Sequence, residues 1–141
     1  MRTDEITEIA EGLFITDSTS GQSLDLSDKG FDAVLCLDRR RYQNPHPDRK
    51  VTCVLAALPE RNCQASHFDT AVGMLKRLVK EHGKVVVHCT HGQNRSVAVV
   101  AAYLVDTGMD PEEALDFVGK RRGARKLIDS SFEDLVRARN H

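Results

Sequence analysis

The sequence predicts an α/β fold in which helices cover both faces of a central, mostly parallel sheet. Short, continuously apolar runs alternate along the chain with longer segments of helical periodicity. Continuous apolar runs are typical of strands buried on both faces, and strands that alternate with helices connect as parallel neighbours. With 141 residues, the chain is expected to form one domain, residues 1–141, around a core of its own.

Strands are expected at residues 34–37, 51–55 and 84–88, and a helix lies between the last two. We expect this helix to begin at a capping box of Ser66 and Asp69 and to end at Gly83. Its apolar residues recur at helical spacing and form one stripe: Phe68, Ala71, Val72, Leu75, Leu78 and Val79.

Three further helices are expected after the last of these strands. Residues 96 to about 106 are apolar almost all round, which is typical of a buried helix. Asp110 is expected to cap the next helix, with Pro111 in its first turn and Glu113 closing the capping box. Ser130 or Ser131 is expected to cap the final one, whose inward residues are Phe132, Leu135 and Val136.

The most informative stretch joins a strand to the buried helix and reads His88-Cys89-Thr90-His91-Gly92-Gln93-Asn94-Arg95-Ser96. A glycine-containing loop that enters a helix forms a cradle of backbone N–H groups at the positive end of the helix dipole. Such a cradle binds a dianionic phosphate, and its field favours the thiolate form of a cysteine at its floor. Arg95 carries a planar fork that holds two phosphate oxygens at once. This combination indicates cysteine-based hydrolysis of phosphate esters.

Two alternatives for Cys89 are a buried structural thiol and a zinc ligand. Zinc comes into question because His88 and His91 stand close to the cysteine in the sequence. A zinc site needs a second cluster at ligand spacing, and Cys63 and His67 do not supply one. We therefore expect no metal and no other cofactor.

The pattern His88-Cys89-x-x-Gly92-x-x-Arg95-Ser96 resembles the phosphate-binding loop of dual-specificity-type cysteine phosphatases, within the protein tyrosine phosphatase superfamily. Residues 6–17, 30–37 and 109–115 resemble the family's opening strand pair, its next buried strand and the start of a late helix. The resemblance thus covers nearly the whole chain. It implies a dual-specificity phosphatase-like fold and hydrolysis of phosphotyrosine and phosphoserine or phosphothreonine in proteins, through a phosphocysteine intermediate.

In that reaction Cys89 attacks phosphorus, while Arg95 and the loop amides hold the equatorial oxygens. The resemblance implies that Ser96 helps the thiolate to leave and that His88 orients the loop. A helix cap is the alternative role of Ser96, and a buried, hydrogen-bonded histidine is that of His88. The expected substrate-binding residues are consecutive: Thr90, His91, Gly92, Gln93, Asn94 and Arg95.

The reaction also needs a general acid to protonate the leaving oxygen. In the family this acid is an aspartate on a loop well before the cysteine, and this chain has no aspartate there. Glu60, in Leu58-Pro59-Glu60-Arg61-Asn62, is the candidate. The alternative is that Glu60 is a solvated loop residue and that the acid is missing.

The interior of the loop leaves other substrates open. Cys-Thr-His-Gly-x-Asn-Arg is similar to the loop of cysteine-type RNA triphosphatases, which lack the aspartate acid. A departing nucleoside diphosphate is a weak base and gains little from protonation. Ser96 and Val97-Ala98 depart from that group's pattern. An RNA 5′ triphosphate end or a phosphoinositide is therefore an alternative to phosphoprotein. A phosphate-binding pseudophosphatase and a rhodanese-like sulfurtransferase are further alternatives.

Composition agrees with a compact cytoplasmic enzyme, which we expect to be a monomer. The formal net charge is −1, so no overall field attracts nucleic acid or membrane. No apolar run approaches the ~20 residues of a membrane span, and the first residues do not resemble a signal peptide. Four irregularly spaced cysteines indicate free thiols in a reducing compartment. Cys36 could approach Cys89 from a neighbouring strand, or simply belong to the core.

Basic residues nevertheless cluster at 39–41, beside Tyr42, and at 120–122 and 125–126. The first cluster follows a predicted strand and could recruit a polyanion at the rim of the catalytic loop, or be solvated surface. For Arg121 and Arg122 we expect solvated surface.

Overall fold

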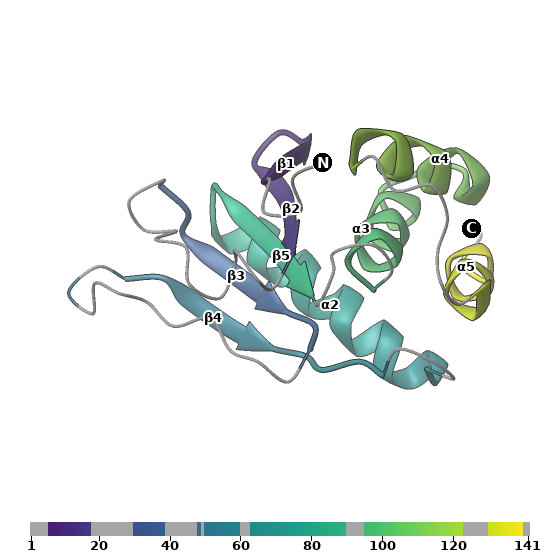
Figure 1. Ribbon diagram of the computed structural model, residues 1–141, viewed down its shortest axis with the longest axis horizontal. Coiled ribbons are helices and arrows are strands. Elements are labelled where there is room, and N and C mark those ends of the chain that lie inside the picture. The colour runs from purple at the N-terminus through teal and green to yellow at the C-terminus, as the bar shows by residue number, and fades with distance from the viewer. Residues whose placement is uncertain are drawn as a thin grey trace.

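The computed structural model describes residues 6–17, 30–38, 48, 50–59, 63–89, 95–122 and 130–139. Its strands form one sheet in the order β1-β2-β5-β3-β4. They are β1 (Thr7–Ala10), β2 (Leu13–Asp17), β3 (Ala33–Cys36), β4 (Thr52–Leu55) and β5 (Val85–Cys89). β1 and β2 are antiparallel, whereas β2–β5, β5–β3 and β3–β4 are parallel pairs. In Figure 1 the arrows of β3, β4 and β5 point the same way.

The three strands expected from apolar runs are therefore present, each displaced by no more than one residue at either end. The opening pair resembling the family's is also present, as β1 and β2. Gly12 makes the turn between them with a φ of 79°. A Cβ atom there would come within 2.5 Å of the Gly83 carbonyl oxygen, so this turn requires glycine for space as well as for conformation.

Four helices are described: α2 (Ala65–Glu81), α3 (Arg95–Asp106), α4 (Pro111–Arg122) and α5 (Ser130–Arg137). The cap at Asp110 is confirmed, because its Oδ2 accepts hydrogen bonds from the backbone N–H groups of Glu112 and Glu113, at 3.1 and 3.3 Å. Pro111 is the first residue of α4, as expected.

Other predicted helix ends are wrong. The N-cap of α2 is Gln64, without a side-chain hydrogen bond, so Ser66 lies inside the helix rather than at its cap. The Asp69 carboxylate pairs instead with Arg139, a distant residue that the local pattern could not reveal. The C-cap is His82, one residue before Gly83. α5 begins at Ser130, so neither predicted serine precedes it.

The described helices share one core with one face of the sheet. Leu35 of β3, Val85 and Val87 of β5 and apolar residues of all four helices belong to a single buried cluster. A smaller cluster on the opposite face is built from Phe31, Val34, Cys36 and Val86. The described helices thus account for one of the two faces predicted to carry helices; residues 18–29, between β2 and β3, lie outside the described residues.

Helix α3 is held most firmly, since ten of its residues are buried, from Arg95 to Val105. Each buried Val or Leu side chain contributes about 1.5–3 kcal/mol to stability. This burial stabilises the position of the first turn of α3 beside the carboxyl end of β5. The segment 88–96, singled out in the sequence, joins these two elements.

Candidate active site

The predicted strand–loop–helix arrangement is present. β5 ends at Cys89 and α3 begins at Arg95, while the loop residues between them, 90–94, lie outside the described residues. The carboxyl ends of the parallel strands β2, β3 and β5 meet at one edge, which is where open α/β sheets bind ligands.

Cys89 and Ser96 meet across this junction. Both are fully buried, and the Cys89 thiol donates a hydrogen bond to the Ser96 hydroxyl at 3.4 Å. Ser96 is the second residue of α3, so the alternative that it caps the helix is wrong. Its hydroxyl instead faces the sulfur, where it can donate a proton or a hydrogen bond to a thiolate.

The Arg95 side chain is hydrogen-bonded to two other segments of the chain at the same edge of the sheet. Its Nη1 donates to the carbonyl oxygens of Leu58, at 2.8 Å, and Leu37, at 3.4 Å. The side chain is only 5% exposed, and these bonds set the plane of its guanidinium group. These bonds hold the guanidinium group at the edge of the sheet at which β5 ends with Cys89.

His88 is fully buried, and its Nε2 lies 3.0 Å from the Cys36 sulfur. Its carbonyl oxygen accepts a hydrogen bond from Leu37 N–H at 2.9 Å, which binds β3 to β5 next to Cys89. A buried, hydrogen-bonded histidine can also position its neighbour, so this geometry is compatible with both roles considered for His88.

Several candidate residues lie outside the described residues: Glu60, the loop residues Thr90, His91, Gly92, Gln93 and Asn94, the basic residues 39–41 and 125–126, and Tyr42. The segment that carries Glu60 starts at the site, however. Leu58, two residues earlier, is buried and bonded to Arg95 through its carbonyl oxygen.

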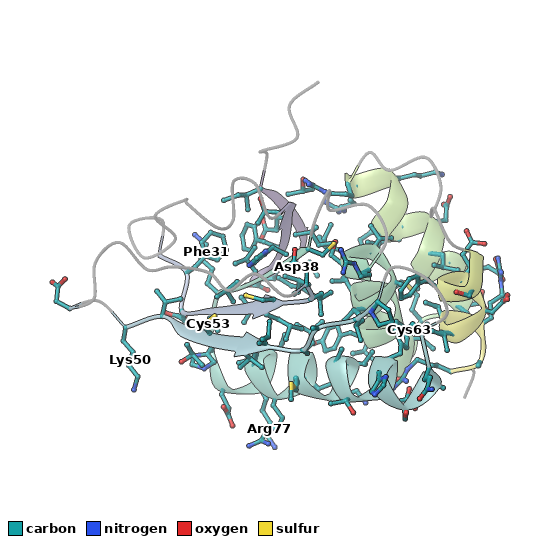
Figure 2. The ribbon with its side chains drawn as sticks, turned by 60° about the horizontal axis from the view of Figure 1, so that its bottom comes forward. Phe31, Asp38, Lys50, Cys53, Cys63 and Arg77 are labelled. Carbon is teal, nitrogen blue, oxygen red and sulfur yellow. The ribbon has the colours of Figure 1, made fainter. Side chains whose placement is uncertain are left out.

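Two residues of this region were not among the sequence candidates for catalysis. Asp38 lies two residues beyond the carboxyl end of β3 and is 6% exposed, a rare degree of burial for a carboxylate. Figure 2 labels it among side chains gathered between sheet and helices. Asp38 could have been predicted from the sequence, because an acidic residue that follows an apolar strand lies at the ligand-binding edge of the sheet.

The second residue is Cys36, for which the second of the two possibilities, that it belongs to the core, is confirmed. Cys36 belongs to the smaller cluster on the opposite sheet face, and its sulfur contacts His88 and Cys53. Side chains alternate between faces along a strand, so a cysteine in register with His88 cannot share a face with residue 89.

The basic residues of α4 contact other side chains, Lys120 and Arg121 within the helix and Arg122 on β1. Lys120 pairs with Asp116, Arg121 stacks over the Phe117 ring and Arg122 donates to Thr7.

Within the described ranges, no three His, Cys, Asp or Glu side chains are grouped so that they could hold a metal ion. No helix of those ranges has the length and apolarity to cross a membrane.

Comparisons with known proteins agree with this geometry. Residues 13–139 match the family described as dual specificity phosphatase, catalytic domain. The chain is 30% identical over 121 residues to Dual specificity protein phosphatase 1B of Arabidopsis thaliana, covering 84% of this chain and 72% of that protein. It is 33% identical over 104 residues to the RNA/RNP complex-1-interacting phosphatase of Bos taurus, covering 68% of this chain and 31% of that protein.

Among solved structures, the human tyrosine phosphatase-like serine/threonine/tyrosine-interacting protein has a similar fold. The TM-score is 0.79 at 23% identity, covering 96% of this chain and 95% of that one. The fold, the family match over residues 13–139 and the 30% identity to a plant phosphatase lead to one conclusion. The chain belongs to the family of dual specificity phosphatase catalytic domains and is a cysteine phosphatase, a phosphoric monoester hydrolase.

Proposed function

We propose that this enzyme dephosphorylates phosphotyrosine and phosphoserine or phosphothreonine in proteins through a phosphocysteine at Cys89. The contact between the Cys89 thiol and the Ser96 hydroxyl carries the proposal, together with the hydrogen bond that holds the Arg95 side chain. This contact supports the proposal because a thiol, a hydroxyl and a guanidinium group at one strand–helix junction suit the roles of nucleophile, proton donor and phosphate clamp.

In the first step the Cys89 sulfur attacks phosphorus, so that an S–P bond forms and the bond to the leaving oxygen breaks. Arg95 and the loop amides hold the equatorial oxygens as charge develops on them. We assign the proton for the leaving oxygen to Glu60. The buried Asp38 carboxylate, at the same edge, is a second candidate for this proton.

In the second step water attacks phosphorus and the S–P bond breaks. The departing sulfur carries the negative charge, and the Ser96 hydroxyl lies where it can stabilise that charge by a hydrogen bond. His88 holds the end of β5 in place through its bond to Cys36. No step calls on a metal ion.

A second substrate class, an RNA 5′ triphosphate end, is favoured by one observation. The loop reads Cys89-Thr90-His91-Gly92-Gln93-Asn94-Arg95, similar to that of cysteine-type RNA triphosphatases. The name of the bovine relative also refers to RNA/RNP complexes. Membership of the phosphatase family removes the sulfurtransferase alternative.

We further propose that residues 1–141 work as a single catalytic domain and as a cytoplasmic monomer. The cysteines Cys36, Cys53, Cys63 and Cys89 are not joined in disulfides, which fits a reducing compartment.

The deciding experiment is a parallel assay, in a chelator of divalent metals, of a phosphotyrosine peptide, a phosphothreonine peptide, a phosphoinositide and a 5′-triphosphorylated RNA. We expect the peptides to give the highest kcat/KM. Cys89→Ser should abolish turnover of every substrate while retaining phosphate binding, and turnover by this variant would contradict the covalent mechanism. A preference for the RNA end would replace the proposed substrate and keep the mechanism.

A further inference from the structure

Two cysteines are in contact on the sheet face opposite Cys89. The Cys36 sulfur lies 3.7 Å from the Cys53 sulfur and 3.0 Å from His88 Nε2. Strand register brings them together, since Cys36 stands opposite His88 on β5, while Cys53 on β4 stands opposite Val34, two residues before Cys36. Residues two apart on a strand share a face, so the three side chains meet.

The two thiols differ in their access to solvent. Cys36 and His88 are fully buried. Cys53 is exposed and lies on β4, which has a single neighbouring strand in the described sheet. A small oxidant in solution therefore reaches the Cys53 sulfur first, and the Cys36 sulfur is already in contact with it.

We propose that Cys36 and Cys53 form an oxidation site, and that their disulfide slows the phosphatase by withdrawing Cys36 from His88 while Cys89 remains a free thiol. Only the second half of this proposal rests on the proposed function, because it requires His88 and Cys89 to serve the reaction. The disulfide itself would form whether or not they do.

The oxidant is a hydroperoxide, and the chemistry takes two steps. The Cys53 thiol attacks one peroxide oxygen, forming a sulfenic acid and releasing an alcohol, or water when the oxidant is hydrogen peroxide. The Cys36 sulfur then attacks the Cys53 sulfur, the S–O bond breaks and hydroxide leaves. His88 Nε2 can take the Cys36 proton during the attack, and hydroxide leaves as water after protonation. Two thiols and one hydrogen peroxide thus give one disulfide and two water molecules, and an alkyl hydroperoxide gives one alcohol and one water.

The disulfide removes a hydrogen-bonding partner from the residue next to the nucleophile. A sulfur in a disulfide carries no proton, and closing the bond turns the Cys36 sulfur toward Cys53. The His88 ring then loses the contact that orients it inside the sheet, and the change is passed to Cys89 through the adjoining peptide. Loss of one such hydrogen bond in the transition state lowers a rate about tenfold.

The cross-link is tested first in Cys89→Ser, which removes the proposed nucleophile. After treatment with hydrogen peroxide, intact mass and peptide mapping should show a Cys36–Cys53 disulfide and a free thiol at Cys63. Cys89→Ser, Cys53→Ser should form none. Absence of the Cys36–Cys53 cross-link in Cys89→Ser would overturn the proposal, and this readout does not depend on activity.

Its effect is tested in the active protein, oxidised with hydrogen peroxide while inorganic phosphate occupies the loop and then desalted. Peptide mapping identifies the preparations in which Cys89 is still a thiol, and only these are assayed. We expect kcat/KM to fall about tenfold and dithiothreitol to restore it. Cys53→Ser should resist this loss.

The matched control is Cys63→Ser, which should lose activity like the parent. Cys63 is the third cysteine besides Cys89, located just before α2 and well separated in Figure 2 from Cys53 on the sheet. A cross-link that leaves kcat/KM unchanged would refute the coupling to His88. Turnover by Cys89→Ser would instead refute the proposed mechanism, so the two failures are distinguishable.

Discussion

The Cys89 thiol donates a hydrogen bond to the Ser96 hydroxyl at 3.4 Å, and no part of either residue is exposed to solvent. The pair connects the last residue of β5 to the first turn of α3, and only residues 90–94 separate these two elements in the sequence. In the proposed mechanism, this contact predicts that the second chemical step is the one most sensitive to residue 96.

Ser96→Ala should therefore slow breakdown of the phosphoenzyme more than its formation. We expect kcat to fall roughly a hundredfold, as for the loss of one donor to a developing charge. A rapid-mixing assay with an aryl phosphate should show a burst of one leaving group per enzyme molecule. Ser66→Ala, an exposed serine of α2, is the control and should show parent kinetics. A Ser96→Ala enzyme without a burst would exclude this role.

Arg95→Lys should lower kcat by about a thousandfold, although the charge is kept. Lysine has no planar fork and cannot both hold two phosphate oxygens and bond to the Leu58 carbonyl oxygen. Arg77→Lys, on the exposed side of α2 (Figure 2), is the matched control and should retain parent activity. Steady-state kinetics of both variants provide the check; an Arg95→Lys enzyme with parental kcat would exclude the clamp.

The general acid can be identified by substitution, because the loss of activity on removing it depends on how strongly the leaving group needs a proton. Glu60→Gln should lower kcat/KM about a hundredfold for phosphoserine peptides, whose leaving alkoxide needs a proton. The effect should be small for a 5′ triphosphate end, whose leaving group is a weak base. Asp38→Asn is the matched variant. If Asp38→Asn shows this pattern and Glu60→Gln does not, the proton comes from the buried aspartate.

Gly12→Ala should destabilise the fold by about 1–3 kcal/mol. The φ of 79° is unfavourable for alanine, and the new Cβ atom would meet the Gly83 carbonyl oxygen. Gly73→Ala on α2 is the control: its Cβ atom meets nothing within 4 Å, so it should stabilise the helix by about 0.5–1 kcal/mol. Urea denaturation measures both, and equal effects would contradict this account.

Arg139→Ala should destabilise the protein by about 3 kcal/mol, because it leaves a buried carboxylate short of a partner. Arg139 donates to Asp106, whose side chain is 4% exposed, and this bond raises the pKa of the Arg139 guanidinium. Lys76 also reaches Asp106 but is itself half exposed. Arg137→Ala is the control, since its partner Glu112 is exposed, and it should cost less than about 1 kcal/mol. Thermal unfolding distinguishes the two.

Much of the fold could be predicted from local pattern. Continuous apolar runs located β3, β4 and β5 to within a residue, and the stripe from Phe68 to Leu78 located α2. Helix ends were less predictable, because Arg139 takes the Asp69 carboxylate that a capping box would use. Periodicity records which residues are buried, whereas the end of a helix depends on partners from elsewhere in the chain.

The sequence by itself determined the class of chemistry, that of a cysteine phosphatase, because the residues proposed as nucleophile, clamp and proton donor lie within one short segment from Cys89 to Ser96. A strand–loop–helix segment brings such residues together by local geometry alone. Only the tertiary structure decided which distant groups support them. Arg95 bonds to the Leu58 carbonyl 37 residues away, and His88 meets Cys36 across 52 residues of chain. Strand order and register create these contacts, and they also put Cys36 on the sheet face away from Cys89.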